Sequence, residues 1–207
     1  MSMTRLRIRV IAVELAGALL VAAGVATAQE PAADHHHAAE ATRPSPFQRS
    51  QHEYSLPEVT LRDQAGRPVP VSQLQGASEP LAVNFIFTTC TTICPVMTAT
   101  FAQMRRELGP EADRIRLVSI TVDPEHDTPA VLAEYAKRFG APSGWSFLTG
   151  SPGDVERVLR ALDAWWGSKA SHRPVTLLRR RGADGWVRLE GLGSGAALAD
   201  QALTVMD

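Results

Sequence analysis

Residues 81–97 read LAVNFIFTTCTTICPVM, and this stretch decides the fold. Its first seven residues form a short, continuous apolar run with β-branched and aromatic members, which predicts a buried central strand. Cys90 and Cys94 follow directly, and Pro95 then stands where a first helical residue is favoured. We therefore expect a strand, a cysteine-bearing loop and a helix over 95–108, one after another.

Strands and helices alternate through the rest of the chain. The segment VTLRDQAGRPVPV (59–71) predicts a hairpin, because two extended runs flank a turn-forming glycine. Further strands are expected over 115–122, 145–148, 175–178 and 186–189. Further helices are expected after Thr128-Pro129, after Ser151-Pro152 and from about Ala196. This alternation predicts an α/β fold in which helices cover both faces of a mixed sheet.

The composition is that of a globular protein with one domain. The chain has 207 residues, of which 44% are hydrophobic and 21% charged, and its formal net charge is −1. Basic residues are not in excess over acidic ones, so the composition does not suggest a nucleic-acid partner.

The first 28 residues are interpreted as a secretory signal peptide. Three arginines precede an apolar run over 10–28, and the run ends in Ala26-Thr27-Ala28, a pattern typical of a cleavage site. A retained membrane anchor is the alternative, since the run is about long enough to cross a bilayer, although Glu14 would be costly there. Both interpretations predict an exported protein.

Residues 29–50 are rich in Ala, Pro, Glu and His and show neither helical nor strand periodicity, which predicts a flexible linker. The domain proper is then expected over 51–207. Within the linker, His35, His36 and His37 are adjacent, so this tract is either a weak site for transition metals or a solvated spacer.

The two cysteines are the main chemical feature. A framework of structural disulfides is excluded, because Cys90 and Cys94 are the only cysteines of the chain. Near the start of a helix both sulfur atoms can point the same way, and the helix N-terminus favours the thiolate. From spacing alone, a metal site, a redox couple and a structural disulfide all remain open.

Three segments bear a strong resemblance to a known family. AVNFIFTTCTTICPVM (82–97), SITVDPEHDTPAVLAEYAKRFG (119–140) and SHRPVTLL (171–178) resemble the Sco (SenC) copper-binding proteins, in which a CxxxCP motif and a distant His bind copper. The resemblance extends over about 51–207.

The resemblance implies a thioredoxin-like fold and a copper carrier rather than an enzyme. It implies that Cys90, Cys94 and His172 hold Cu(I) or Cu(II), which is delivered to the dinuclear copper centre of cytochrome c oxidase. The implied partners are the copper-accepting oxidase subunit and other copper chaperones or thiol reductants. The implied location is the periplasm, or the inner membrane facing the periplasm.

Two positions depart from the family pattern. Ser171 precedes the late histidine where an acidic residue is frequent, and His126 occupies a position in the VDPExDTP loop that more usually holds another polar residue. We interpret His126 as incidental, with a role as fourth ligand as the alternative. Asp123 and Asp127, in the same loop, are expected to serve turn and cap chemistry.

Two alternative functions use the same cysteines. A thiol-disulfide oxidoreductase could keep the cysteine ligands of the oxidase reduced by attack of a thiolate on a disulfide. A peroxiredoxin-like peroxidase fits less well, because the proline that such enzymes carry upstream would fall at Phe87.

Overall fold

The computed structural model describes residues 45–206. Its strands are β1 (Gln48–Glu53), β2 (Thr60–Arg62), β3 (Pro68–Pro70), β4 (Leu81–Ile86), β5 (Arg116–Thr121), β6 (Trp145–Leu148), β7 (Val175–Arg179) and β8 (Gly185–Glu190). Its α-helices are α1 (Ser72–Gln75), α2 (Ile93–Leu108), α3 (Pro129–Arg138), α4 (Pro152–Ala161) and α5 (Gly195–Met206). Two 3₁₀-helices, η1 (Gly109–Arg114) and η2 (Lys169–Ser171), complete the set.

The main sheet is mixed and has the order β1-β8-β7-β4-β5-β6. β4 pairs in parallel with β5 and antiparallel with β7, so it lies in the interior of the sheet, as its apolar sequence predicts. All six residues of β4 are buried. The hairpin of β2 and β3 forms a separate small sheet, which confirms the prediction for 59–71.

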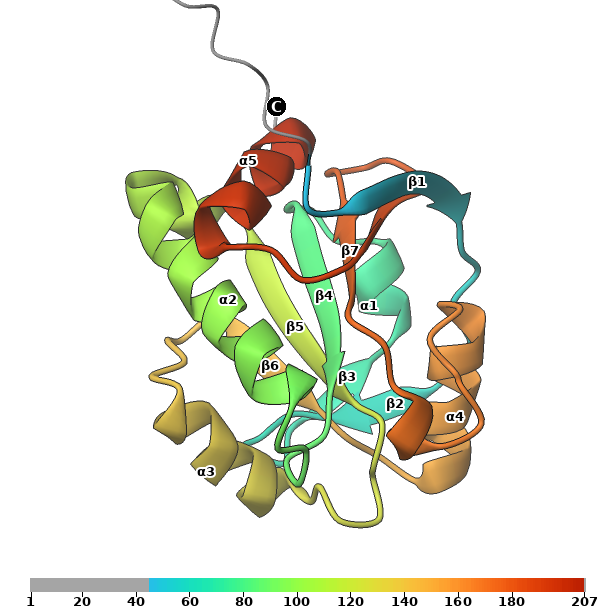
Figure 1. Ribbon diagram of the computed structural model, residues 1–207. Helices are drawn as coiled ribbons and strands as arrows, with labels where there is room; N and C mark the ends of the chain where they lie inside the picture. Colours follow the sequence, from blue (N-terminus) through green and yellow to red (C-terminus); the bar gives the residue numbers. More distant parts are fainter. Residues whose placement is uncertain (1–44, 207) are drawn as a thin grey trace, which may run out of the picture. The chain divides into compact units, whose positions relative to one another are not determined.

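Helices cover both faces of the main sheet (Figure 1). Along β4, Ala82 and Ile86 pack in one apolar cluster with residues of α2, α3 and α5. Val83 and Phe85 point to the other side and pack with residues of α1, α4 and the hairpin. The predicted fold class, an α/β thioredoxin-like fold with a mixed sheet flanked by helices, is confirmed.

Most predicted elements are present, with one shift that affects the site. Thr128 and Ser151 cap α3 and α4 through their hydroxyl groups, as predicted. However, α2 begins at Ile93, before Pro95. Cys94 therefore lies in the first turn of α2 and not in the loop that precedes it.

The start of the domain corrects the linker boundary predicted at Ser50. Phe47 is buried, and β1 pairs with β8 from Gln48 onward. A Cβ atom at Gly193 would lie only 2.4 Å from the Phe47 ring, so a glycine at that position leaves room for this side chain. The residues of β1 are polar and mostly exposed, which is why no strand periodicity reveals them.

The predictions for 1–28 and for the linker up to residue 44, including His35, His36 and His37, lie outside the described residues. Within the part of the chain that the structure describes, no helix has the length and apolar character needed to cross a bilayer.

Candidate functional site

The fold brings the two cysteines and His172 to one end of the sheet. Cys90 lies in the loop that leaves β4, and Cys94 lies in the first turn of α2. His172 follows η2 and leads into β7, which runs antiparallel beside β4. The start of β7 therefore lies next to the end of β4, and residues 78 positions apart meet.

The side chains of Cys94 and His172 are in direct contact. The Sγ atom of Cys94 lies 3.5 Å from Nδ1 of His172, and both residues are buried. A metal ion with bonds of about 2.3 Å to sulfur and about 2.0 Å to nitrogen holds such atoms at about this separation when its geometry is tetrahedral. The pair can therefore share one ion without a large rearrangement.

Cys90 contacts the first turn of α2 through its sulfur atom. Its Sγ atom accepts a hydrogen bond from the backbone N–H of Cys94 at 3.5 Å and lies 3.5 Å from the hydroxyl of Thr92. The first N–H groups of a helix lack partners within the helix, so the sulfur of Cys90 satisfies one of them. Both cysteines are free thiols.

The two thiols differ in their acidity. Burial tends to raise the pKa of Cys90, but hydrogen bonds from the backbone of Cys94 and from Thr92 outweigh it and lower the pKa to about 7. Burial raises the pKa of Cys94 well above its ordinary range. At neutral pH, Cys90 is thus the thiol of the pair with a substantial thiolate fraction, and Cys94 stays protonated until a cation or a disulfide partner takes the place of its proton.

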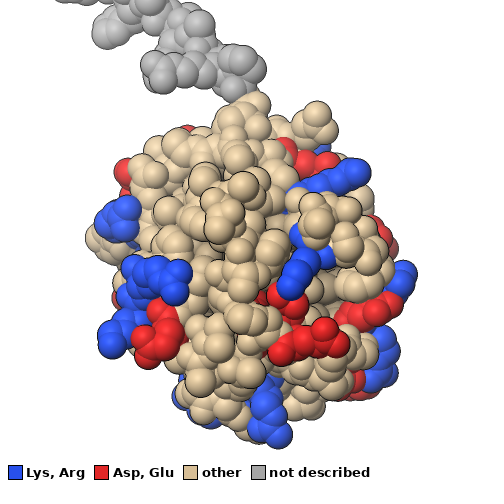
Figure 2. Space-filling model, turned by 60° about the horizontal axis from the view of Figure 1, so that its bottom comes forward, with Lys and Arg blue, Asp and Glu red and all other residues tan. Residues whose placement is uncertain are grey.

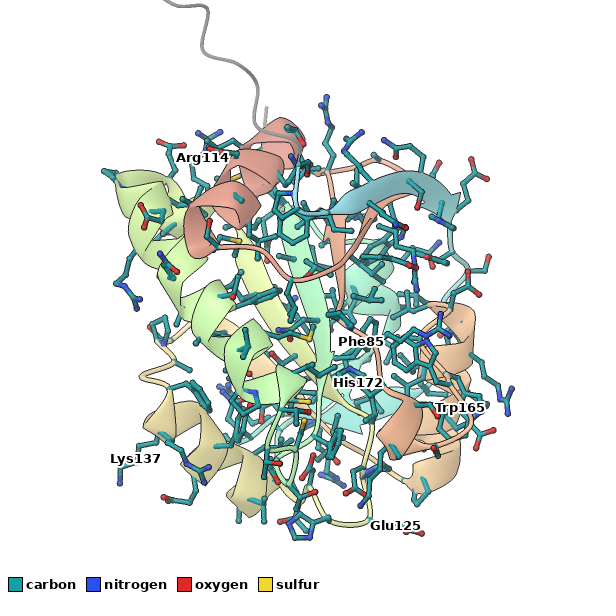
Figure 3. The ribbon with its side chains drawn as sticks, in the orientation of Figure 1. Phe85, Arg114, Glu125, Lys137, Trp165 and His172 are labelled. Atoms are coloured by element: carbon teal, nitrogen blue, oxygen red, sulfur yellow. The ribbon has the colours of Figure 1, made fainter. Side chains whose placement is uncertain are left out.

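His172 is held in an apolar environment as a neutral imidazole. Burial lowers its pKa to about 4, and the backbone of Phe85 has a smaller effect in the opposite direction. The Nε2 atom of the ring is buried and has no hydrogen-bond partner of ordinary geometry among the described residues. The ring packs edge-on against Phe87 and Trp166, with centroids 6.0 and 5.2 Å away. Figure 3 shows His172 in the interior beside Phe85. A neutral imidazole keeps a free lone pair for a metal at physiological pH.

The mouth of the site is open. A hollow of about 280 Å³ is lined by the cysteine loop together with Lys169, Ala170 and His172. In Figure 2, which brings the lower end of the molecule forward, uncharged residues fill much of the centre and a group of acidic and basic side chains lies just to its right. Cys90 is partly exposed and Cys94 is buried. A partner can therefore approach Cys90 from outside.

The described residues do not form a closed metal cage. Among residues 45–206, no group of three or more His, Cys, Asp or Glu side chains is assembled around one point. The reason is visible in the contacts: the sulfur of Cys90 faces the backbone of Cys94, whereas the sulfur of Cys94 faces His172. The side chain of Cys94 is thus the one that lies between Cys90 and His172.

The loop between β5 and α3 contacts both the loop that carries Cys90 and the segment that leads to His172. The carboxylate of Asp127, fully buried, accepts hydrogen bonds from the backbone N–H and hydroxyl of Thr88 and from the hydroxyl of Thr121. Asp123 forms an ion pair with Lys169 at 2.6 Å. The sequence predicts only local turn and cap roles for these carboxylates. It does not reveal the contacts with Thr88 and Lys169, because these partners lie up to 46 residues away in the chain.

Other candidate residues lie apart from the two cysteines. His126 is exposed on the loop after β5, where its backbone N–H donates to the carbonyl of Asp123. Met97 and Met104 are buried in the core, as their helical spacing predicts. Trp166 is a site residue that sequence reasoning missed, since an aromatic after an amphipathic helix indicates core packing in general and no particular neighbour.

Comparison with known proteins points to one family. A family model described as SCO1/SenC matches residues 48–176. An SCO1 protein homolog of Bacillus subtilis is 37% identical over 105 residues, which cover 50% of this chain and 53% of the homolog. The chain thus spans about half the length of the curated relatives that it matches.

Solved structures share the fold. Arabidopsis thaliana ScoI, determined with copper bound, has a TM-score of 0.60 and 26% identity, and the match covers 70% of this chain and 93% of that one. BsSco, described as a member of the Sco family of cytochrome c oxidase assembly proteins with a disulfide switch, has a TM-score of 0.63 and 26% identity. That match covers 76% of this chain and 96% of the BsSco chain.

Proposed function

Because the chain belongs to the SCO1/SenC family, we propose that it is a copper carrier in which Cys90, Cys94 and His172 hold the metal. Copper is the cargo, and its destination is the dinuclear copper centre of cytochrome c oxidase. Two solved relatives support this function, one determined with copper bound and one described as belonging to oxidase assembly proteins.

The contact between Cys94 Sγ and His172 Nδ1 carries the proposal. Thiolate and imidazole donors suit copper, and two thiolates favour Cu(I) in particular. Cys90 supplies the second sulfur, which is already deprotonated in large part because its pKa is about 7. The proton of the Cys94 thiol leaves when the metal binds.

Release of the cargo follows from the same arrangement. Three protein ligands leave a coordination position for an incoming donor, whereas a closed four-ligand site does not. Cys90 faces the open hollow, so an acceptor thiolate or imidazole can reach the metal from its side. The acceptor in this proposal is the copper-binding subunit of the oxidase.

The proposed location is outside the cytoplasm, in the periplasm or at the inner membrane facing it. The apolar segment 10–28 supports export by either a cleaved signal or a retained anchor. In that compartment the thiols are exposed to oxidation, and bound copper protects them while it is carried.

Competitive titration of the reduced protein with a Cu(I) chelator tests the metal and its ligands. We expect about one copper per protein, bound more tightly than zinc. His172→Ala should weaken copper binding strongly, whereas His126→Ala, which alters an exposed histidine of a nearby loop, should leave it unchanged. Retention of zinc together with loss of copper to a weak chelator would contradict the proposal.

A second function is favoured by the asymmetry of the two thiols. Cys90, partly exposed and with a pKa of about 7, can attack one sulfur of a disulfide in a target protein. Cys94 then attacks Cys90 in the mixed disulfide, and the target leaves with two thiols while Cys90 and Cys94 become a disulfide. An external thiol reductant must restore the pair.

The variant His172→Ala separates the two functions. Disulfide exchange needs only the two sulfur atoms, so the variant should retain exchange with a model disulfide while it loses copper. Oxidase assembly in cells that carry the variant then decides between them. Normal assembly at ordinary copper supply would favour the reductase, and failed assembly would favour the carrier.

A further inference from the structure

The ion pair between Lys169 and Asp123 joins two loops of the site. The ammonium group of Lys169 donates to Oδ2 of Asp123 at 2.6 Å. Asp123 lies two residues after β5 and is buried, whereas Lys169 opens η2 and keeps its side chain half exposed. His172 lies three residues after Lys169 and donates its backbone N–H to the carbonyl of Lys169.

The segment that carries His172 has few other polar links. Among the described residues, only two hydrogen bonds leave segment 165–172, namely His172 to Cys94 and Lys169 to Asp123. The remaining hydrogen bonds of the segment stay within it, between Ser168 and Ser171 and between Lys169 and His172. Apart from its aromatic packing and the contact between His172 and Cys94, the segment is therefore tied to the rest of the described protein through Lys169.

The loop that receives Lys169 is itself well anchored. The carbonyl of Asp123 accepts the N–H groups of His126 and Asp127, which closes the turn. The carboxylate of Asp127 then holds Thr88, two residues before Cys90. One turn thus contacts the cysteine loop through Asp127 and the histidine loop through Asp123.

We propose that Lys169 is a positioning residue for His172, acting through its ion pair with Asp123. The inference rests on the proposed function, in which His172 is a copper ligand. The ion pair keeps the histidine loop against the turn that also holds the cysteine loop, so the three donors remain within reach of one ion.

The expected size of the effect follows from the position of the pair. A half-exposed ion pair adds little to global stability. It acts instead on the fraction of molecules whose loop is ready to bind, and the apparent dissociation constant rises as that fraction falls. If the loop without the pair is in place for between a third and a tenth of the time, copper affinity falls about three- to tenfold.

Five variants of the full protein test the proposal. Lys169→Met and Asp123→Asn each remove the ion pair. The double variant changes both partners of this same pair, so it has no further interaction to lose. Lys169→Arg keeps the charge. Lys137→Met is the matched control, since it removes an exposed lysine of α3 that points away from the molecule (Figure 3).

Copper affinity is measured by competition, and hydrogen exchange of the backbone amides of 169–172 is measured in the reduced apoprotein. We expect a three- to tenfold loss of affinity and faster exchange in both single variants, no further loss in the double variant, recovery with Lys169→Arg, and no change with Lys137→Met. The thermal unfolding midpoint should stay close to that of the unchanged protein in every variant.

Unchanged affinity and exchange in Lys169→Met would overturn the proposal, and so would additive losses in the double variant or an equal loss in Lys137→Met. Failure of the proposed function gives a different result, because the unchanged protein would then not bind copper or His172→Ala would bind it normally. In that case the exchange of the apoprotein amides still decides whether Lys169 holds the loop.

Discussion

Nδ1 of His172 lies 3.5 Å from Sγ of Cys94, although 78 residues separate the two in the chain. The antiparallel pairing of β4 and β7 produces this contact, since it places the entry to one strand beside the exit from the other. A histidine that lies three residues before β7 and a cysteine in the helix that follows β4 thereby come into contact. The following predictions test the chemistry and the packing around this pair.

The two cysteines should differ in their reaction with iodoacetamide. In the reduced apoprotein, Cys90 should react first, because it is partly exposed and its pKa is about 7, while burial keeps Cys94 protonated. The rate at Cys90 should rise with pH and level off above a midpoint near pH 7, as the thiolate is the reactive form. Mass spectrometry of alkylated peptides measures both sites. Equal rates at the two cysteines would contradict this asymmetry.

Oxidised glutathione should convert the copper-free thiols to a disulfide between Cys90 and Cys94. Cys90 attacks the glutathione disulfide, Cys94 then displaces the bound glutathione, and two reduced glutathione molecules form for each protein disulfide. Copper loading should block the reaction by occupying the sulfur atoms. A thiol count after prolonged incubation checks both forms. Persistent free thiols in the apoprotein would show that the sulfur atoms do not converge.

Asp127→Ala should destabilise the protein by about 1–3 kcal/mol, because the buried hydroxyl of Thr121 and the partly buried donors of Thr88 lose their acceptor. The same change should release the cysteine loop and alter the alkylation rate at Cys90. Asp113→Ala, at a carboxylate whose side chain is 86% exposed, is the control and should change stability little. Urea unfolding measures the free energies. Similar unfolding energies for the two variants would contradict the structural role of Asp127.

Phe47→Ala tests where the domain begins. The ring is buried beside Gly193, so its removal should cost about 3 kcal/mol, within the range for a large side chain that leaves a cavity. Leu203→Ala, at an exposed residue of α5, should cost far less. A protein that begins at residue 51 should be destabilised even more, since it lacks half of β1 as well. Wild-type stability of that shortened protein would restore the boundary at Ser50.

The elements around the cysteines were predictable for local reasons. An apolar run, two cysteines and a proline specify a buried strand, a loop and a helix within 28 residues, 81–108. The caps at Thr128 and Ser151 are likewise local, because each hydroxyl accepts from a backbone N–H three residues further on. The edge strand β1 escaped prediction, since its polar residues gain order only by pairing with β8.

The sequence by itself determined the alternation of strands and helices, the position of the cysteine pair at the start of a helix and, through its motifs, the family. The tertiary structure alone decided which distant groups meet: Cys94 with His172, Trp166 with His172, Asp127 with Thr88, and Lys169 with Asp123. Local signals depend on spacing within a few residues, whereas these contacts depend on the order of strands in the sheet. That order is set by the burial of both apolar faces of β4 at once, which no short segment encodes.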